Sequence, residues 1–182
     1  PGTHKHIPTI STGLDSVRAY QWEIHLTLPD GISDNADFPS KFTLAAKQVT
    51  AVGFASEPIE VNRVNDKMFY PGKATPEELT VTFDNFYKTN GGVSVALWKW
   101  FQHTTYNPMT GGMGNVAGKF KATHATLMHL DSQGQPDYET TLYGVWPISW
   151  KTAEFNYGTN EFHTIEVVFR YDFMDHNVGG VG

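Results

Sequence analysis

The feature that most constrains this fold is a strict alternation of side chains near the end of the 182-residue chain. The apolar or aromatic positions of this run are Ile165, Val167, Phe169, Tyr171 and Phe173. The positions between them are Glu166, Val168, Arg170 and Asp172. Because successive side chains of a strand point to opposite faces, the run predicts a long strand with one buried face. We expect the other strands to lie against it.

A second constraint comes shortly before this run, at Trp146-Pro147. Proline has no N–H to donate to a ladder, so strand pairing is predicted to stop or shift there. We predict a buried Trp146, with Pro147 ending the pairing where the chain crosses toward the last strand. Gly158 and Asn160 predict a turn or irregular crossing between the two segments.

Similar alternation predicts further strands over residues 20–28, 42–49, 58–61, 68–70, 79–83, 120–130 and 138–145. Apolar residues at spacings of three and four predict one helix that packs on the sheet through Val93, Ala96, Leu97, Trp100 and Phe101. The chain therefore predicts a mainly β, α+β domain, an antiparallel sandwich or partial barrel with one packed helix. We expect a domain over residues 17–173, an arm over 1–16 and a tail over 174–182. The expected core anchors are Trp22, Trp100, Trp146 and Pro147.

The charge composition limits the possible partners. The formal net charge is −6, which opposes binding to nucleic acid or to anionic membranes. Charged residues make up 18% of the chain and aromatic residues 14%. This balance is typical either of an aromatic-rich β core or of a surface that copies of the chain cover. No apolar run approaches the ~20 residues that span a bilayer, so we expect a soluble protein without a membrane-spanning segment.

Motifs for chemistry are weak. The string Gly112-Met-Gly114-Asn-Val-Ala117 resembles a dinucleotide fingerprint, but it follows the predicted helix and precedes a strand, the reverse of what pyrophosphate binding needs. The chain has no cysteine, no HExxH string and no Gly-x-Ser-x-Gly elbow. We expect no catalytic residue, no metal and no cofactor. Trp98, Trp100, Trp146 and Trp150 leave open a sugar-stacking surface, with core packing the simpler interpretation.

The order of the segments is more specific than any single motif. QWEIHL (21–26) is followed by FTLAAKQVTAVGF (42–54), an extended hairpin, LTVTFDNF (79–86) and the helix VALWKWF (95–101). LYGVWPISW (142–150) and FHTIEVVFRYDF (162–173) complete the series. This order resembles the tail tube protein of contractile-tailed bacteriophages, a family related to the tube proteins of type VI secretion and other contractile injection systems. The longer N-terminal segment and the Gly-rich end depart from the family.

The resemblance implies hexameric rings that stack into the inner tail tube, whose strands form a continuous inner barrel around a lumen that conducts DNA. The implied partners are other copies, the sheath protein, and tape-measure, baseplate or tube-initiator and tail-terminator proteins, with double-stranded DNA passing through unbound. The implied location is the virion, after assembly in the host cytoplasm. A tube that conducts protein effectors in an injection apparatus is the alternative. A monomeric carbohydrate-binding β-sandwich is the rival class, and an enzyme ranks behind both.

Two sets of candidate residues follow from this resemblance. The hairpin over 62–75 resembles the family's ring-stacking loop, and its charged candidates are Arg63, Asp66, Lys67 and Lys73. A lumen that conducts DNA is expected to be polar and acidic on balance, because cations that neutralise phosphates would retain the DNA. The lumen-lining candidates are Glu23, Asp84, Glu166 and Asp172, with Glu78 beside them and Arg170 as the one cation.

Overall fold

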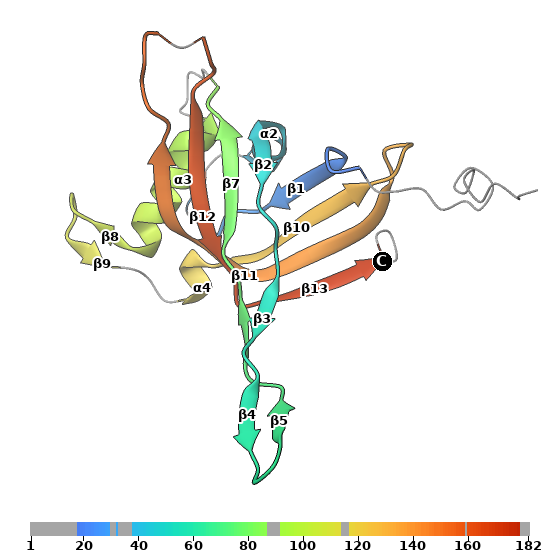
Figure 1. Ribbon diagram of the computed structural model, residues 1–182. Coiled ribbons are helices and arrows are strands. Elements are labelled where there is room, and N and C mark those ends of the chain that lie inside the picture. The colour runs from blue at the N-terminus through green and yellow to red at the C-terminus, as the bar shows by residue number, and fades with distance from the viewer. Residues whose placement is uncertain are drawn as a thin grey trace, which may run out of the picture.

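The described part of the chain consists of residues 18–29, 32, 38–86, 92–113, 117–158 and 160–178 of a computed structural model. Its dominant feature is a large antiparallel sheet with helices on one side and a long hairpin that extends away from it (Figure 1). The predicted mainly β fold with a packed helix is therefore confirmed. The extended N-terminal segment predicted over 1–16 lies outside the described residues.

The main sheet is organised around one very long strand. Its strands are β1 (Trp22–Leu26), β2 (Ala46–Val49), β7 (Leu79–Asp84), β10 (Ala122–Leu130), β11 (Pro136–Thr152), β12 (Thr164–Arg170) and β13 (Phe173–Val178). They are hydrogen-bonded in the order β1-β10-β11-β12-β7-β2, with β13 also beside β11. The first half of β11 pairs with β10 and β13, and its second half, from Trp146, pairs with β12. We call β1, β10, β13 and the first half of β11 the first sheet, and the second half of β11 with β12, β7 and β2 the second sheet.

The change from one sheet to the other takes place at Gly144. This residue has a φ of 66°, which only glycine adopts at little cost. A Cβ at this position would also collide with the carboxylate of Asp172. Lys121 Nζ donates to both oxygens of that carboxylate at 2.7 Å. The N–H of Asp172 donates to the carbonyl of Tyr143 at 2.9 Å, between β12 and β13. β11 therefore bends at Gly144, and the backbone conformation of this glycine and the Lys121–Asp172 ion pair fix the bend.

The core lies where the two sheets and the helices meet. α3 (Gly92–Thr104) buries Val93, Leu97 and Trp100, the stripe that its spacing predicts. Trp100 packs on Phe169 of β12 at 5.7 Å between ring centroids, and its indole N–H donates to the carbonyl of Phe120 at 2.6 Å. The alternating residues of β7 and β12 are buried as predicted, and they are Leu79, Val81, Phe83, Ile165, Val167 and Phe169.

The predicted strand over 42–49 is wrong in its first half. Residues Phe38–Ala45 form the helix α2, and only Ala46–Val49 forms a strand. In a strand Phe42 and Leu44 would share a face, yet Phe42 is fully buried and the Leu44 side chain is 78% exposed. Phe42 and Ala45, one helical turn apart, pack into the core instead, with the Phe42 ring 4.8 Å from that of Phe83.

The expectations around Trp146 and the last strand also need correction. β11 continues through Pro147, which pairs with Phe169 beside a bulge, so the proline shifts the register without ending the strand. Trp146 is half-buried and lies opposite Arg170, on the face of the second sheet that points away from the core. The alternating run breaks after Tyr171, because β13 begins at Phe173, and Phe173 stacks on Tyr143 outside the core. β13 also runs into the segment expected to be a tail.

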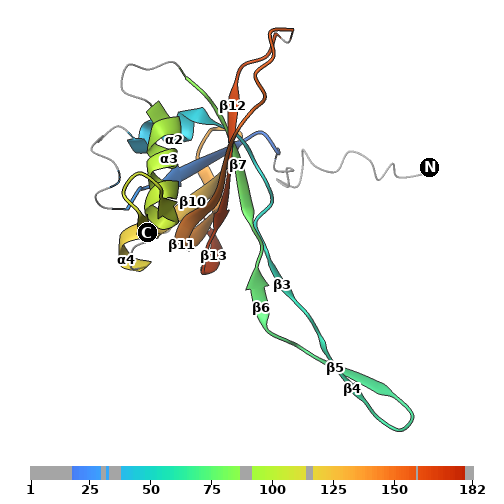
Figure 2. The ribbon, with the colours of Figure 1, turned by 90° about the vertical axis from the view of Figure 1, so that its left-hand side faces the viewer.

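The hairpin between β2 and β7 leaves the body as a narrow two-stranded arm (Figure 2). It consists of β3 (Phe54–Ser56), β4 (Ile59–Asn62), β5 (Lys67–Tyr70) and β6 (Ala74–Pro76), and we call it the arm. β3 pairs with β6 and β4 with β5, which confirms the predicted hairpin. Two smaller features follow α3: the pair β8 (Tyr106–Asn107) and β9 (Gly112–Met113), and the short helix α4 (Ala117–Phe120).

Candidate assembly surfaces

The second sheet has one open face, opposite the core. Its register places Thr82 between Gln48 and Glu166, and Glu166 opposite Lys151. A parallel row across the sheet contains Thr80, Val168 and Ser149. Figure 2 shows helices on one side of β7 and β12 and no element of the body on the other. This face is therefore a polar surface that the strand alternation itself creates.

The charges on this open face occur in complementary pairs. Arg170 donates to Glu78 at 2.7 Å, Lys47 Nζ lies 3.7 Å from Asp84 Oδ1, and Lys151 stands across the ladder from Glu166. The face thus carries equal numbers of carboxylates and cations, and Arg170 is not the one cation on it. The acid excess expected for a lumen is absent from this surface.

The structure divides the lumen candidates among three places. Asp84 and Glu166 lie on the open face of the second sheet, together with Glu78. Glu23 lies on the first sheet, on the face away from the core, where it is 3.2 Å from His25. Asp172 lies at the bend of β11 with Lys121. These four residues therefore do not line one surface of a single subunit.

Two strand edges of the second sheet carry no partner strand among the described residues. The second half of β11 pairs with β12 only, since its pairing with β10 ends at Val145. At the other end of the sheet β2 pairs with β7 only. An unpaired edge presents free N–H and C=O groups, which a strand from another chain can satisfy. The second sheet is thus open on both sides.

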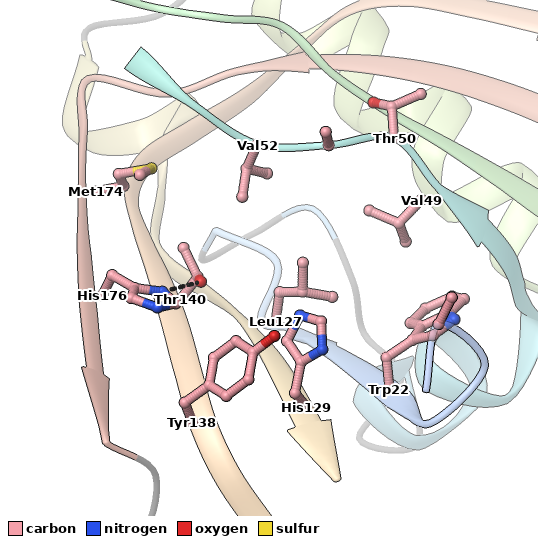
Figure 3. A pocket seen from close by; sticks show the side chains of 12 residues that line it. Trp22, Val49, Thr50, Val52, Leu127, His129, Tyr138, Thr140, Met174 and His176 are labelled. Atoms are coloured by element: carbon pink, nitrogen blue, oxygen red, sulfur yellow. Dashed lines mark hydrogen bonds between the residues drawn. The ribbon is translucent and has the colours of Figure 1, made fainter. Parts of the chain in front are cut away.

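A lateral pocket of about 560 Å³ opens beside the β2 edge (Figure 3). Its walls come from the stretch that follows β2 and from the core-facing side of the first sheet, including Trp22, His129, Tyr138 and His176. His129 stacks on Tyr138 at 4.2 Å, and His176 lies 2.8 Å from the Thr140 hydroxyl. Burial, assisted by His176 and opposed by Asp137, lowers the pKa of His129. The residues that line the pocket include no carboxylate.

The arm is fastened to the body at its base. The hydroxyl of Tyr171 donates to the carbonyl of Gly53 at 2.9 Å, and burial there raises the pKa of Tyr171. Farther along, Gly72 passes so close to the carbonyl of Glu57 that a Cβ would collide with it. Sequence reasoning missed the Tyr171 anchor, because the partner is a backbone group 118 residues away.

The four charged candidates of the arm lie along it without converging. Lys67 pairs with Glu60 across β4 and β5 at 2.7 Å, whereas Arg63 and Asp66 stand at the tip. Lys73 lies just before β6. One face of the β4–β5 ladder is apolar, and the register places on it Ile59, Val61, Met68 and Tyr70. The arm therefore exposes apolar side chains that no other described residue covers.

The other expected anchors are partly or fully buried. Trp100 and Pro147 are buried, and Trp22 packs against the core at the pocket wall. No group of three or more potential metal ligands occurs among the described residues. Within the same residues, no helix is long and apolar enough to cross a membrane.

Comparisons with solved structures agree on the fold. Over 91% of its length this chain matches 93% of a chain in the structure of the anti-feeding prophage cap, the tube-terminating cap, with a TM-score of 0.67 and 14% identity. It matches 99% of a chain in the sheath/tube terminator of an extracellular contractile injection system, with a TM-score of 0.65 and 14% identity over 91% of its own length. In the sheath-tube complex of that system the TM-score is 0.61, at 15% identity, with 90% of this chain and 92% of that chain covered.

At the level of sequence, no curated protein matches this chain. The family model described as T4-like virus tail tube protein gp19 matches residues 35–175. That range contains the arm, α3, the whole of β11 and the open face of the second sheet. This chain belongs to the T4-like virus tail tube protein family and is a structural subunit of a tail tube.

Proposed function

We propose that this chain forms hexameric rings that stack into the inner tube of a contractile phage tail, and that the tube conducts DNA. The observation that carries the proposal is the pair of open edges on the second sheet. If the β2 edge of one copy pairs with the β11 edge of the next, every subunit contributes its second sheet to one barrel. Closure then removes the exposed edges that a lone subunit leaves unsatisfied.

In such a ring the open face of the second sheet lines the lumen. The concave wall of a closed barrel is one face of its strands, and the other face of this sheet is occupied by α3 and the core. Asp84, Glu166 and Glu78 then face the lumen, whereas Glu23 and Asp172 do not. The lateral pocket adjoins the β2 edge and lies against the neighbouring subunit.

Paired charges suit a conduit for DNA. Binding to DNA is driven by cations that replace the counterions of phosphates, so a wall that conducts DNA must keep few cations free. Here each cation of the open face has a carboxylate beside or across from it. The wall is close to neutral, and it resists DNA binding because its cations are paired with carboxylates. The half-buried Trp146 is the one indole among these face residues.

The arm is the proposed stacking element, since it extends beyond the body and exposes apolar and charged residues. The remaining partners of the proposal are the sheath around the tube, a tape-measure protein within it, and baseplate or initiator and terminator proteins at its ends. The site of action is the virion after assembly in the host cytoplasm. The proposed role requires no catalysis.

Electron microscopy of the purified protein tests this function. Rings or tubes with a lumen support it, and an electrostatic map of the inner wall shows whether Asp84 and Glu166 line it. Compact monomers that bind glycans would overturn it in favour of the carbohydrate-binding class. A wall with a net positive charge, or one covered by aromatic rings, would contradict DNA conduction even if tubes form.

A tube of an injection apparatus that conducts protein effectors is the second candidate. It is favoured by the similarity in fold to chains of the anti-feeding prophage and of an extracellular contractile injection system. The two candidates differ in what the assembled particle carries. A DNA-filled head on the particle supports the phage tail, and a headless particle with protein in its tube supports the injection apparatus.

A further inference from the structure

Exposed aromatic side chains gather at the end of the body opposite to the arm. The connection from β11 to β12, of which residues 153–158 and 160–163 are described, carries Phe155 at 80% exposure and Phe162 at 89%, with Tyr157 fully exposed. We call this connection the distal loop. Figure 1 shows it at the top of β11 and β12 and the β4–β5 tip at the bottom. The tip is apolar as well, since Val64 is 99% exposed and Phe69 63%. Each subunit thus has an uncovered apolar end at both extremes.

A hollow of about 590 Å³ lies under the distal loop. It is bounded by loop residues, including Phe155 and Phe162, and by Gln48 and Thr82 of the second sheet. Because Gln48 and Thr82 belong to the open face, the hollow opens on that side of the body. Figure 2 shows the arm inclined toward the same side. A copy displaced along the strands of the second sheet would therefore bring its arm to this hollow.

The base of the distal loop makes hydrogen bonds and a ring contact within the subunit. Ala153 donates to the carbonyl of Thr164 at 2.9 Å, and Asn85 donates to the carbonyl of His163 at 3.0 Å. The ring of Phe155 stacks on His163 at 4.4 Å between centroids. Phe155 is therefore held in position before any partner arrives, which reduces the entropy lost on binding.

The charges of the two ends are complementary. The distal loop contains two carboxylates, Glu154 and Glu161, and no lysine or arginine. The tip over 62–67 contains two cations and one anion. Lys67 is engaged by Glu60, while Arg63 has no ion pair within the described residues. Arg63 is thus the cation that the tip can offer to a carboxylate of another chain.

We propose that the distal loop and the hollow beneath it receive the arm tip of a second copy of this chain, with Val64 against the loop aromatics and Arg63 facing Glu154 and Glu161. The proposal rests on the proposed tube and names the surface to which the arm binds. The contact is heterologous, because tip and loop are different surfaces at opposite ends. A contact of this kind leaves free tips at one end and free loops at the other end of every stack, so addition of copies continues without closure.

Cysteine cross-linking tests the proposal directly, because the chain contains no cysteine of its own. The variant that combines Val64→Cys with Phe155→Cys is assembled and then oxidised. We expect a ladder of covalent multimers on a denaturing gel, since each copy links to the next. The matched control combines Val64→Cys with Ser132→Cys, an exposed site on the β10–β11 turn, and we expect it to stay monomeric. Each single-cysteine variant should also give no ladder.

Microscopy of the same samples before oxidation separates this inference from the tube itself. Normal tubes without a ladder, or tubes that cross-link through Ser132→Cys, would overturn the docking surface and leave the tube intact. A wild-type protein that forms neither rings nor tubes would overturn the proposed function as well.

Charge reversal gives a second readout that does not depend on cysteine geometry. Arg63→Glu should leave rings and abolish tubes, and Glu154→Arg with Glu161→Arg should do the same. Combining all three substitutions should restore part of the tube yield. Tubes that withstand either reversal would contradict the assigned contact.

Discussion

The body and the arm contain the same alternation of side chains but use it differently. In β7 the alternating residues Leu79, Val81 and Phe83 are fully buried between helices and sheet. In β4 and β5 the alternating residues Ile59, Val61 and Tyr70 are exposed, and no other part of the described chain covers their face. A period of two thus identifies a strand with one apolar face, but it does not say whether the chain itself or another copy covers that face.

The difference separates stability from assembly. A buried face contributes to folding in proportion to the apolar area removed from water, whereas an exposed one contributes nothing until a partner arrives. Substitutions in the body should therefore change the free energy of unfolding. Substitutions in the arm should change polymerisation and leave that free energy unaltered.

The largest effect is expected for Trp100→Ala, at the centre of the body. Trp100 is fully buried, and the change leaves a void and an unpaired carbonyl at Phe120, so it should cost about 3–5 kcal/mol of unfolding free energy. Chemical denaturation measures this cost. Trp146→Ala is the matched control, and its cost should be smaller because Trp146 is half-buried on the open face. Equal costs would show that the open face is not separate from the core.

Gly144→Ala should follow, with a loss of roughly 1–3 kcal/mol. The left-handed backbone and the collision with the Asp172 carboxylate both oppose a Cβ at the bend of β11. Gly134→Ala separates the two causes. Gly134 has a φ of 78° but no atom within 4 Å of its Cβ position, so only the backbone cost remains there. If the two variants lose the same stability, the contact with Asp172 does not constrain the bend.

A smaller effect should come from His129 at the pocket wall. Its pKa is lowered in the folded state, mainly by burial, so the unfolded chain binds the proton at the higher pH, near 6.5. The unfolding free energy should therefore decrease as the pH falls below about 6.5, and the decrease ends below the lowered pKa. Denaturation curves between neutral and mildly acidic pH measure this slope. His129→Gln should flatten it, and an unchanged slope would contradict the assignment to His129.

The smallest effect on stability is expected for Val64→Ser at the arm tip. Val64 is 99% exposed, so its replacement should change the unfolding free energy by no more than about 0.5 kcal/mol. Tube formation, measured by sedimentation, should nevertheless be lost. Val81→Ser makes the same change in the body and should lower the melting temperature clearly, since Val81 is fully buried. A destabilised Val64→Ser variant would mean that the arm packs on its own subunit.

Much of the body could be predicted from alternation and spacing alone. β7, β12 and α3 have strong local patterns that agree with their packing, so propensity and tertiary structure give the same result. Residues 42–45 mislead because alternation over so few positions is also compatible with one helical turn. Pro147 misleads for another reason: it lies beside a bulge in a half of β11 with a free edge, where a missing N–H costs little.

The candidate surfaces were less predictable, because they depend on register. Glu78 and Arg170 are 92 residues apart in the chain and meet only because β7 and β12 pair as they do. The face on which Trp146 lies depends on the bend at Gly144, and the alternation of side chains in the sequence does not reveal that bend. Whether Glu23 and Asp172 share a surface with Asp84 likewise depends on which sheet each strand joins.

The sharing of β11 by both sheets has a mechanical consequence. Its 17 residues run from the ladders that it forms with β10 and β13 to the ladder that it forms with β12. A force that pulls on the second sheet along the strands is therefore transmitted to the first sheet through covalent bonds. The two sheets cannot separate by losing side-chain packing alone, because β11 would first have to lose the hydrogen bonds of its ladder in one of the sheets. The ion pair of Lys121 with Asp172 lies at the point where this tension passes from one sheet to the other.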